Sequence, residues 1–282
     1  MIKSLGLALL AGALCVSTAG AVHDPDITSR EFKCQGGLSK AAVKFVGAKQ
    51  KCVNKCVRGA RKRNNPEVDC FPPYGGAALS CIADLKRGAE TKAIAAIDKA
   101  CEQVPFLTDC PECYSARSGP ADCSAHGFAV VVGGLSNPPA PSLEAQVDAF
   151  AFLYCNDGGA NQTATETKCE SRLAKALVQF VGCKNECYDG CFGAMHRGAI
   201  PMGSCAPPLP AYVATQNCLF DPITGCEAKA IAACDKACTI PPADAPECYG
   251  FSCSSIVALV ETAVDGNIPT NYCGSPSGAF VD

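Results

Sequence analysis

Residues 44–56 read Lys44-Phe45-Val46-Gly47-Ala48-Lys49-Gln50-Lys51-Cys52-Val53-Asn54-Lys55-Cys56, and residues 179–191 read Gln179-Phe180-Val181-Gly182-Cys183-Lys184-Asn185-Glu186-Cys187-Tyr188-Asp189-Gly190-Cys191. The two stretches share a phenylalanine, a valine, a glycine, a lysine and two cysteines at the same spacing. In both, apolar residues and cysteines recur at every third or fourth position, which is the pattern of one buried face of an α-helix. This pattern predicts a long helix over residues 31–60 and a second one around residues 166–191.

The likeness continues on both sides of these stretches. The further matches are Glu31-Phe32-Lys33-Cys34 with Glu166-Thr167-Lys168-Cys169, Cys70-Phe71-Pro72-Pro73 with Cys205-Ala206-Pro207-Pro208, residues 92–101 with residues 229–238, and Pro111-Glu112-Cys113-Tyr114 with Pro246-Glu247-Cys248-Tyr249. Both segments close on Tyr-Cys, at residues 154–155 and 272–273. Self-similarity on this scale indicates a tandem duplication.

The chain begins with a pattern typical of a secretory signal peptide. Lys3 precedes an apolar run over residues 5–16, and Ala19-Gly20-Ala21 offers a cleavage site. We therefore divide the chain into a signal peptide (1–21), an N-terminal tail (22–30), copy one (31–155), a linker (156–165), copy two (166–273) and a C-terminal tail (274–282). The expected location is extracellular, or the periplasm or cell envelope if the host is bacterial, with no transmembrane segment.

Cysteine content defines the class of protein. Of the 23 cysteines, Cys15 lies in the signal peptide, ten lie in copy one and twelve in copy two. Even numbers in an exported chain indicate disulfides that close within each copy. Copy one alone has Cys110, and copy two alone has Cys183, Cys226 and Cys234. The sequence thus predicts an all-α, disulfide-rich fold in which a three-helix unit occurs twice.

The remaining helices of each unit are placed by composition and by helix-ending residues. Second helices are expected over 88–102 and 226–239, and third helices over 142–153 and 254–264, with Ser142 and either Ser254 or Ser255 as N-caps. Long loops rich in Pro and Gly are expected at 64–76 and 200–210. Residues 128–132 fit a short strand or a buried turn.

Pairs of cysteines spaced by four residues suggest how the helices are joined. Such neighbours on one helix are about 5–6 Å apart at Cβ, too far for a bond between them, so each should bond to an adjacent helix. If the first two helices of a copy run antiparallel, the candidate disulfides are Cys187–Cys238, Cys191–Cys234, Cys52–Cys101 and Cys56–Cys110. The arrangement resembles the helical hairpins with twin CxxxC pairs of several small exported or intermembrane-space proteins.

Signatures of catalysis are sparse. Cys110-Pro111-Glu112-Cys113 is a C-x-x-C sequence, but no βαβ unit surrounds it, which favours a structural bridge over redox activity. Hydrolase and phosphate-binding motifs are missing, and the chain has three histidines. We expect no enzymatic activity and no cofactor. Thiolates of the CxxxC pairs could instead hold Cu(I) or Zn(II), which makes metal storage an alternative function.

Charge differs between the two copies. Residues 22–123 hold 16 Lys and Arg against 12 Asp and Glu, whereas residues 124–282 hold 7 against 15. One stripe of the first long helix is basic, and its members are Lys33, Lys40, Lys44, Lys51, Lys55, Arg58 and Lys62. Three interpretations stay open: a solvated helix face, docking onto the acidic copy, or a site for an anionic partner such as a surface polysaccharide or a lipid headgroup. Nucleic acid is not expected, because the chain is acidic overall and no aromatics interleave with the stripe.

These observations favour a secreted, non-enzymatic structural or ligand-binding protein of the cell surface or extracellular space. A secreted toxin or effector is a further alternative that the cysteine content fits equally well. The sequence makes no prediction of oligomeric state.

Overall fold

The computed structural model describes residues 29–63, 67–101, 111, 114, 123–136, 139–154, 163–201, 203–238 and 252–272. The elements of this part are α1 (Ser29–Lys62), η1 (Val68–Cys70), α2 (Gly76–Ala83), α3 (Ala89–Cys101), α5 (Cys123–Phe128), η2 (Ala129–Gly133), β1 (Leu135–Ser136), β2 (Pro139–Ala140), α6 (Leu143–Ala149), η3 (Ala151–Tyr154), α7 (Ala164–His196), α8 (Val213–Phe220), α9 (Cys226–Cys238) and α10 (Cys253–Asn271). Its only strands form one antiparallel hairpin with two residues on each side. A mostly helical, disulfide-rich fold is therefore confirmed.

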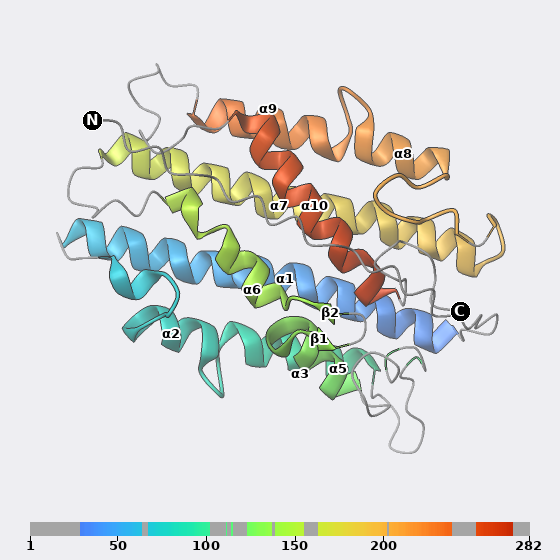
Figure 1. The fold of residues 1–282 in the computed structure, drawn as a ribbon, viewed down its shortest axis with the longest axis horizontal. Coiled ribbons are helices and arrows are strands. Elements are labelled where there is room, and N and C mark those ends of the chain that lie inside the picture. The colour runs from blue at the N-terminus through green and yellow to red at the C-terminus, as the bar shows by residue number, and fades with distance from the viewer. Residues whose placement is uncertain are drawn as a thin grey trace.

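The two long helices α1 and α7 lie side by side at the centre of the molecule and run antiparallel (Figure 1). Gly36 near the start of α1 approaches Asp189 near the end of α7, and Asn54 near the end of α1 accepts a hydrogen bond from Ser171 near the start of α7. Helices α2 and α3 follow the outer side of α1, and α8 and α9 follow the outer side of α7. Helices α6 and α10 cross over one face of this layer.

The predicted helices over 31–60, 88–102 and 226–239 correspond to α1, α3 and α9. Ser142 caps α6 as expected, because its hydroxyl accepts a hydrogen bond from the backbone N–H of Ala145. The expected cap at Ser254 or Ser255 is wrong. Helix α10 begins earlier, since the hydroxyl of Ser252 accepts the bond from the N–H of Ser255.

Three short α-helices, α2, α5 and α8, were not anticipated. Helices α2 and α8 follow the Pro-rich loops and lead into α3 and α9, in stretches to which the sequence analysis assigned no element. Residues 128–132 were expected as a short strand or a buried turn. Phe128 instead ends α5, and the residues that follow form the π-helical turn η2. The predicted signal peptide, residues 1–21, lies outside the described residues. None of the described helices is both long enough and apolar enough to cross a membrane.

The hydrophobic core has two parts. The smaller part lies between α1 and α3 and includes Leu38, Phe45 and Ile97. The larger part surrounds α7, but it also takes Val53 and Val57 from α1. Copy one thus contributes to the core that copy two builds, so the two copies form one packed body.

Candidate functional site

Eight disulfides join pairs of described cysteines, and each of these eight lies within one copy. They are Cys34–Cys101, Cys52–Cys81 and Cys56–Cys70 in copy one, and Cys169–Cys238, Cys183–Cys226, Cys187–Cys218, Cys191–Cys205 and Cys234–Cys253 in copy two. Cys123 is disulfide-bonded as well. The predicted pairings Cys52–Cys101, Cys187–Cys238 and Cys191–Cys234 are wrong. Cys56–Cys110 is wrong as well, because Cys56 bonds to Cys70. Cys110 itself lies outside the described residues.

The register of the helical hairpin explains these errors. Helix α3 does run antiparallel to α1, but its last residue, Cys101, bonds to Cys34 in the second turn of α1. Cys52 lies about 27 Å further along α1 at 1.5 Å per residue, far beyond the reach of Cys101. It meets the unexpected helix α2 instead, through Cys81.

Among the described residues, two groups of cysteines have sulfurs close enough together for metal binding. Cys34, Cys101 and Cys123 form one group, and Cys183, Cys187 and Cys226 form the other, with all sulfurs of a group within 4.8 Å of one another. All six sulfurs are in disulfide bonds. A thiolate is the form of cysteine that binds zinc or copper, so these groups could take a metal only after reduction.

The basic stripe is exposed along its whole length, at Lys33, Lys40, Lys44, Lys51, Lys55, Arg58 and Lys62. On a helix with about 100° per residue, these positions lie roughly opposite Lys49, which contacts α6. The stripe therefore faces away from α6 and α10. The antiparallel pairing of α1 and α7 also brings exposed Lys168 and Lys175 of copy two toward its C-terminal half.

The two ends of the stripe have different surroundings. Near the N-terminal end, the Lys40 ammonium lies 3.9 Å from the Asp189 carboxylate of α7. At the other end, Lys51, Lys55, Arg58 and Lys62 have no ion-pair partner among the described residues. We call these four, together with Lys168 and Lys175, the basic face.

Arg61 does not extend this surface, although it follows the stripe in sequence. Its side chain is 8% exposed and forms ion pairs with Glu67 and with Glu170 of α7. It also donates a hydrogen bond to Thr167. These two carboxylates raise the pKa of Arg61 against the opposing effect of burial. Arg61 therefore joins the two copies from inside.

A buried lysine holds a pair of carboxylates in each copy, a feature that the sequence analysis missed. Lys49 Nζ lies 2.8 Å from Glu144 and 2.6 Å from Asp148 of α6. Lys184 Nζ lies 2.6 Å from Glu261 and 2.8 Å from Asp265 of α10. Neither lysine side chain is exposed to solvent. Each cluster therefore fixes the covering helix to the long helix of its own copy.

Burial perturbs the acidic groups around these lysines. Burial raises the pKa of Asp265 to about 6, and the Lys184 ammonium opposes the rise. Glu90, beside the first cluster, has its pKa raised to about 7 by burial and then by the nearby Glu144 carboxylate. Because the lysines are closed off from solvent, the arrangement suits a structural ion cluster rather than a site open to a substrate.

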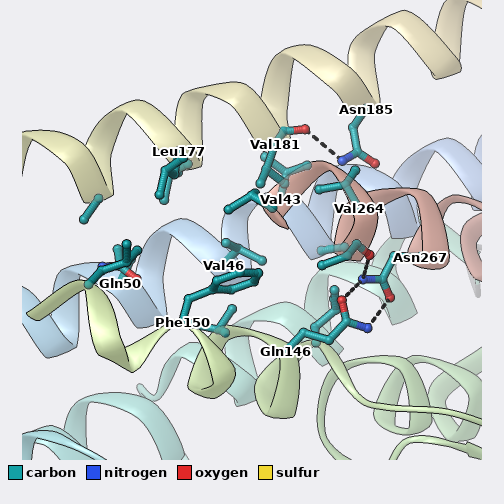
Figure 2. Close-up of a pocket in the computed structure, with 18 of the residues that line it drawn as sticks. Val43, Val46, Gln50, Gln146, Phe150, Leu177, Val181, Asn185, Val264 and Asn267 are labelled. Carbon is teal, nitrogen blue, oxygen red and sulfur yellow. Dashed lines mark hydrogen bonds between the residues drawn. The ribbon is translucent and has the colours of Figure 1, made fainter. Parts of the chain in front are cut away.

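An apolar cavity of about 70 Å³ lies where the two copies meet. It is lined by α1, α6 and η3 of copy one and by α7 and α10 of copy two. Its walls are mainly aliphatic, with Val43 and Val46 on one side and Val181 and Val264 on the other (Figure 2). The side-chain amides of Gln50, Gln146, Asn185, Asn267 and Asn271 complete the lining. No pattern in the sequence indicates this cavity, because it depends on the docking of two distant segments.

No family model, curated protein or solved structure matches this chain. The argument for function therefore comes from the surfaces and the cavity of the molecule itself.

Proposed function

We propose that this chain is an exported, non-enzymatic binding protein, built by tandem duplication of one helical unit, that attaches to an anionic polysaccharide through its basic face. The duplication is supported by equivalent disulfides and by the two buried lysine clusters. It is also supported by the contact between the copies, where Gly36 lies against Asp189 and Asn54 bonds to Ser171. Gly36 and Ser171 occupy equivalent positions of the two copies, and so do Asn54 and Asp189. Reciprocal pairs of this kind characterise a two-fold interface.

The observation that carries the proposed function is the row of unpaired cations on α1. Lys51, Lys55, Arg58 and Lys62 extend over about 16 Å of helix, with no carboxylate among the described residues to neutralise them. Clustered like charges repel one another and raise the local concentration of anions. A straight row suits a linear polymer whose own charges repeat along its length.

The disulfides suit a protein that works outside the cell, where thiols are oxidised. Metal storage in its place would require the same cysteines as free thiols. A thiol titration on denatured, unreduced protein separates these two functions, because a scaffold gives almost no free thiol and a storage protein gives many. No described contact favours a toxin or effector role.

The test uses the whole chain, because the copies share a core. A variant with Lys51, Lys55, Arg58 and Lys62 all changed to Gln is compared with the wild type on a heparin column. A control variant carries the same change of charge at exposed positions elsewhere, namely Lys86, Arg87, Lys92 and Lys236. We expect the wild type and the control to be retained and to elute as salt screens the charges, and the basic-face variant to elute at clearly lower salt.

Equal elution of all three proteins would refute the proposal. Binding to anionic vesicles without retention on heparin would assign the basic face to a membrane surface instead.

A further inference from the structure

We propose that Cys218 is a site of S-thiolation, at which a low-molecular-weight thiol such as glutathione is kept as a mixed disulfide. The proposal does not depend on the basic face. It rests on a feature of copy two that copy one lacks, a second disulfide in contact with the bridge that Cys218 forms.

Two disulfides of copy two lie against each other. Cys187 on α7 bonds to Cys218 on α8. Cys183, one turn earlier on α7, bonds to Cys226 at the start of α9. The Sγ atoms of Cys187 and Cys226, which belong to different bridges, are 3.4 Å apart. A disulfide bond is about 2.0 Å long, so an approach of about 1.4 Å would join these two sulfurs.

A dissolved thiol can reach this pair of bridges from one side. Cys218 is exposed, whereas Cys187 and Cys226 are buried. Side chains cover the backbone of a helix, so the exposed area of a helical cysteine belongs mainly to its Cβ and Sγ. The sulfur open to attack is therefore that of Cys218, and the leaving sulfur is that of Cys187.

The reaction consists of two exchanges. In the first, the external thiolate attacks Sγ of Cys218, and Cys187 leaves as a thiolate with the electron pair of the broken bond. In the second, this thiolate attacks Sγ of Cys226, and Cys183 leaves as a thiolate that takes a proton from water. Two disulfides are present before and after, so no oxidant is required.

The second exchange is what keeps the added thiol in place. At an isolated bridge, the released thiolate stays beside the mixed disulfide, re-forms the original bond at high effective concentration and expels the external thiol. Once Cys187 is bonded to Cys226, it is no longer available for that attack. The free thiol has moved to Cys183, a half-buried residue of α7.

Copy one contains the isolated bridge for comparison. Cys52–Cys81 is the equivalent disulfide, and Cys81 is exposed like Cys218. Ala48 and Ala89 take the places of the second pair, and no sulfur of another bridge contacts Cys52 within the described part of the chain. A thiol that adds to Cys81 should therefore be expelled again.

A contact between bridges does not suffice without access. Cys34, which bonds to Cys101, lies 3.5 Å from the sulfur of disulfide-bonded Cys123. These three cysteines are buried, so none of them offers a sulfur to a dissolved thiol. The combination of contact and exposure distinguishes Cys218 from them.

The experiment treats the full-length oxidised protein with reduced glutathione under native conditions. The reaction is stopped with acid, remaining thiols are alkylated, and peptides are mapped by mass spectrometry. We expect glutathione on Cys218, alkylation of Cys183 and a new Cys187–Cys226 bridge. Cys81 should carry several times less glutathione than Cys218.

Two double variants test the part played by the second bridge. Cys183→Ala/Cys226→Ala removes it and should lower the glutathione on Cys218 to the level of Cys81. Ala48→Cys/Ala89→Cys adds it to copy one and should raise Cys81 to the level of Cys218. The proposal is overturned if Cys218 and Cys81 carry equal glutathione in the wild type, or if alkylation falls on Cys187 in place of Cys183. It is overturned as well if removing the second bridge leaves the amount on Cys218 unchanged.

Discussion

Replacing Lys184 by Met tests whether the buried ion cluster holds α10 on α7. Lys184 Nζ contacts one oxygen of Glu261 at 2.6 Å and one of Asp265 at 2.8 Å, and the lysine side chain is fully buried. Methionine keeps most of the length of the side chain and removes its charge. The variant would leave two carboxylates four residues apart on α10 without their cation.

The size of the effect follows from the exposure of these groups. Removing one partner of a buried ion pair typically costs about 3–5 kcal/mol, because the remaining charge is stranded. The Glu261 and Asp265 side chains are 19% and 12% exposed, so water relieves part of the penalty. We therefore expect a loss of about 3 kcal/mol near neutral pH. In a chain of this size, the loss lowers the melting temperature by roughly 6–12 °C.

The loss of stability caused by Lys184→Met should depend on pH. Burial raises the native pKa of Asp265 to about 6, above the value of about 3.9 in an unfolded chain. The native state therefore binds this proton more tightly than the unfolded state, so this group's contribution to stability falls as pH rises between about 4 and 6. Without Lys184 the native pKa rises further, and acid should restore much of the lost stability.

The assay is thermal unfolding by circular dichroism of the oxidised protein at low salt, at pH 7.5 and at pH 4.5. Lys175→Met, at an exposed position on the same helix, is the control and should change stability by less than about 0.5 kcal/mol. The reasoning fails if Lys184→Met melts within 2 °C of the wild type at pH 7.5, a margin of about 0.5–1 kcal/mol. It fails too if the deficit is the same at both pH values.

Two further predictions concern other contacts that hold the fold together. Arg61→Ala leaves the buried Glu170 carboxylate without its cation and should destabilise the protein by about 3–5 kcal/mol. Thermal unfolding measures the loss, with Arg63→Ala at an exposed position as the control. Similar melting temperatures of the two variants would contradict a role for Arg61 between the copies. The double variant Cys183→Ala/Cys226→Ala should fold and lose about 3 kcal/mol, since Cys187–Cys218 already shortens the closed loop to roughly a dozen residues. Peptide mapping should still recover the other disulfides, and scrambled pairing would contradict the expectation.

The long helices could be predicted because their apolar faces repeat at helical spacing over more than 30 residues. The same apolar stripe also indicates the buried ion clusters, because it contains a lysine in both long helices. Lys49 lies one turn from Phe45 and about one turn from Cys52, both buried, and Lys184 has the same place in copy two. A lysine on the apolar face of two equivalent helices implies a buried carboxylate partner.

The disulfide pairings could not be derived, because they depend on where the hairpin turns. An antiparallel hairpin can be built in many registers, and the choice here depends on α2, whose residues 76–83 show no helical stripe long enough to recognise. One pairing is indicated by comparing which cysteines the two copies have. Cys183 and Cys226 bond to each other, and their equivalents in copy one are Ala48 and Ala89, so the pair is present or missing as a unit.

The features that the two copies share lie in the interior of the protein. The features that distinguish them lie on the exposed face of α1 and α7 that carries the basic stripe. The lysine clusters recur, and so does the turn before α3 and α9, where Asp84 and Asp221 accept backbone N–H groups in the same way. By contrast, Lys44, Lys51 and Lys55 of the basic stripe are replaced by Gln179, Glu186 and Gly190 in copy two, whereas Lys33 and Lys40 keep lysine equivalents there. Folding requirements act on the internal features of both copies alike, so they do not account for a charge difference confined to an exposed face. The cavity, by contrast, belongs to neither copy alone, because residues of both copies line it. Filling the cavity should therefore leave retention on heparin intact.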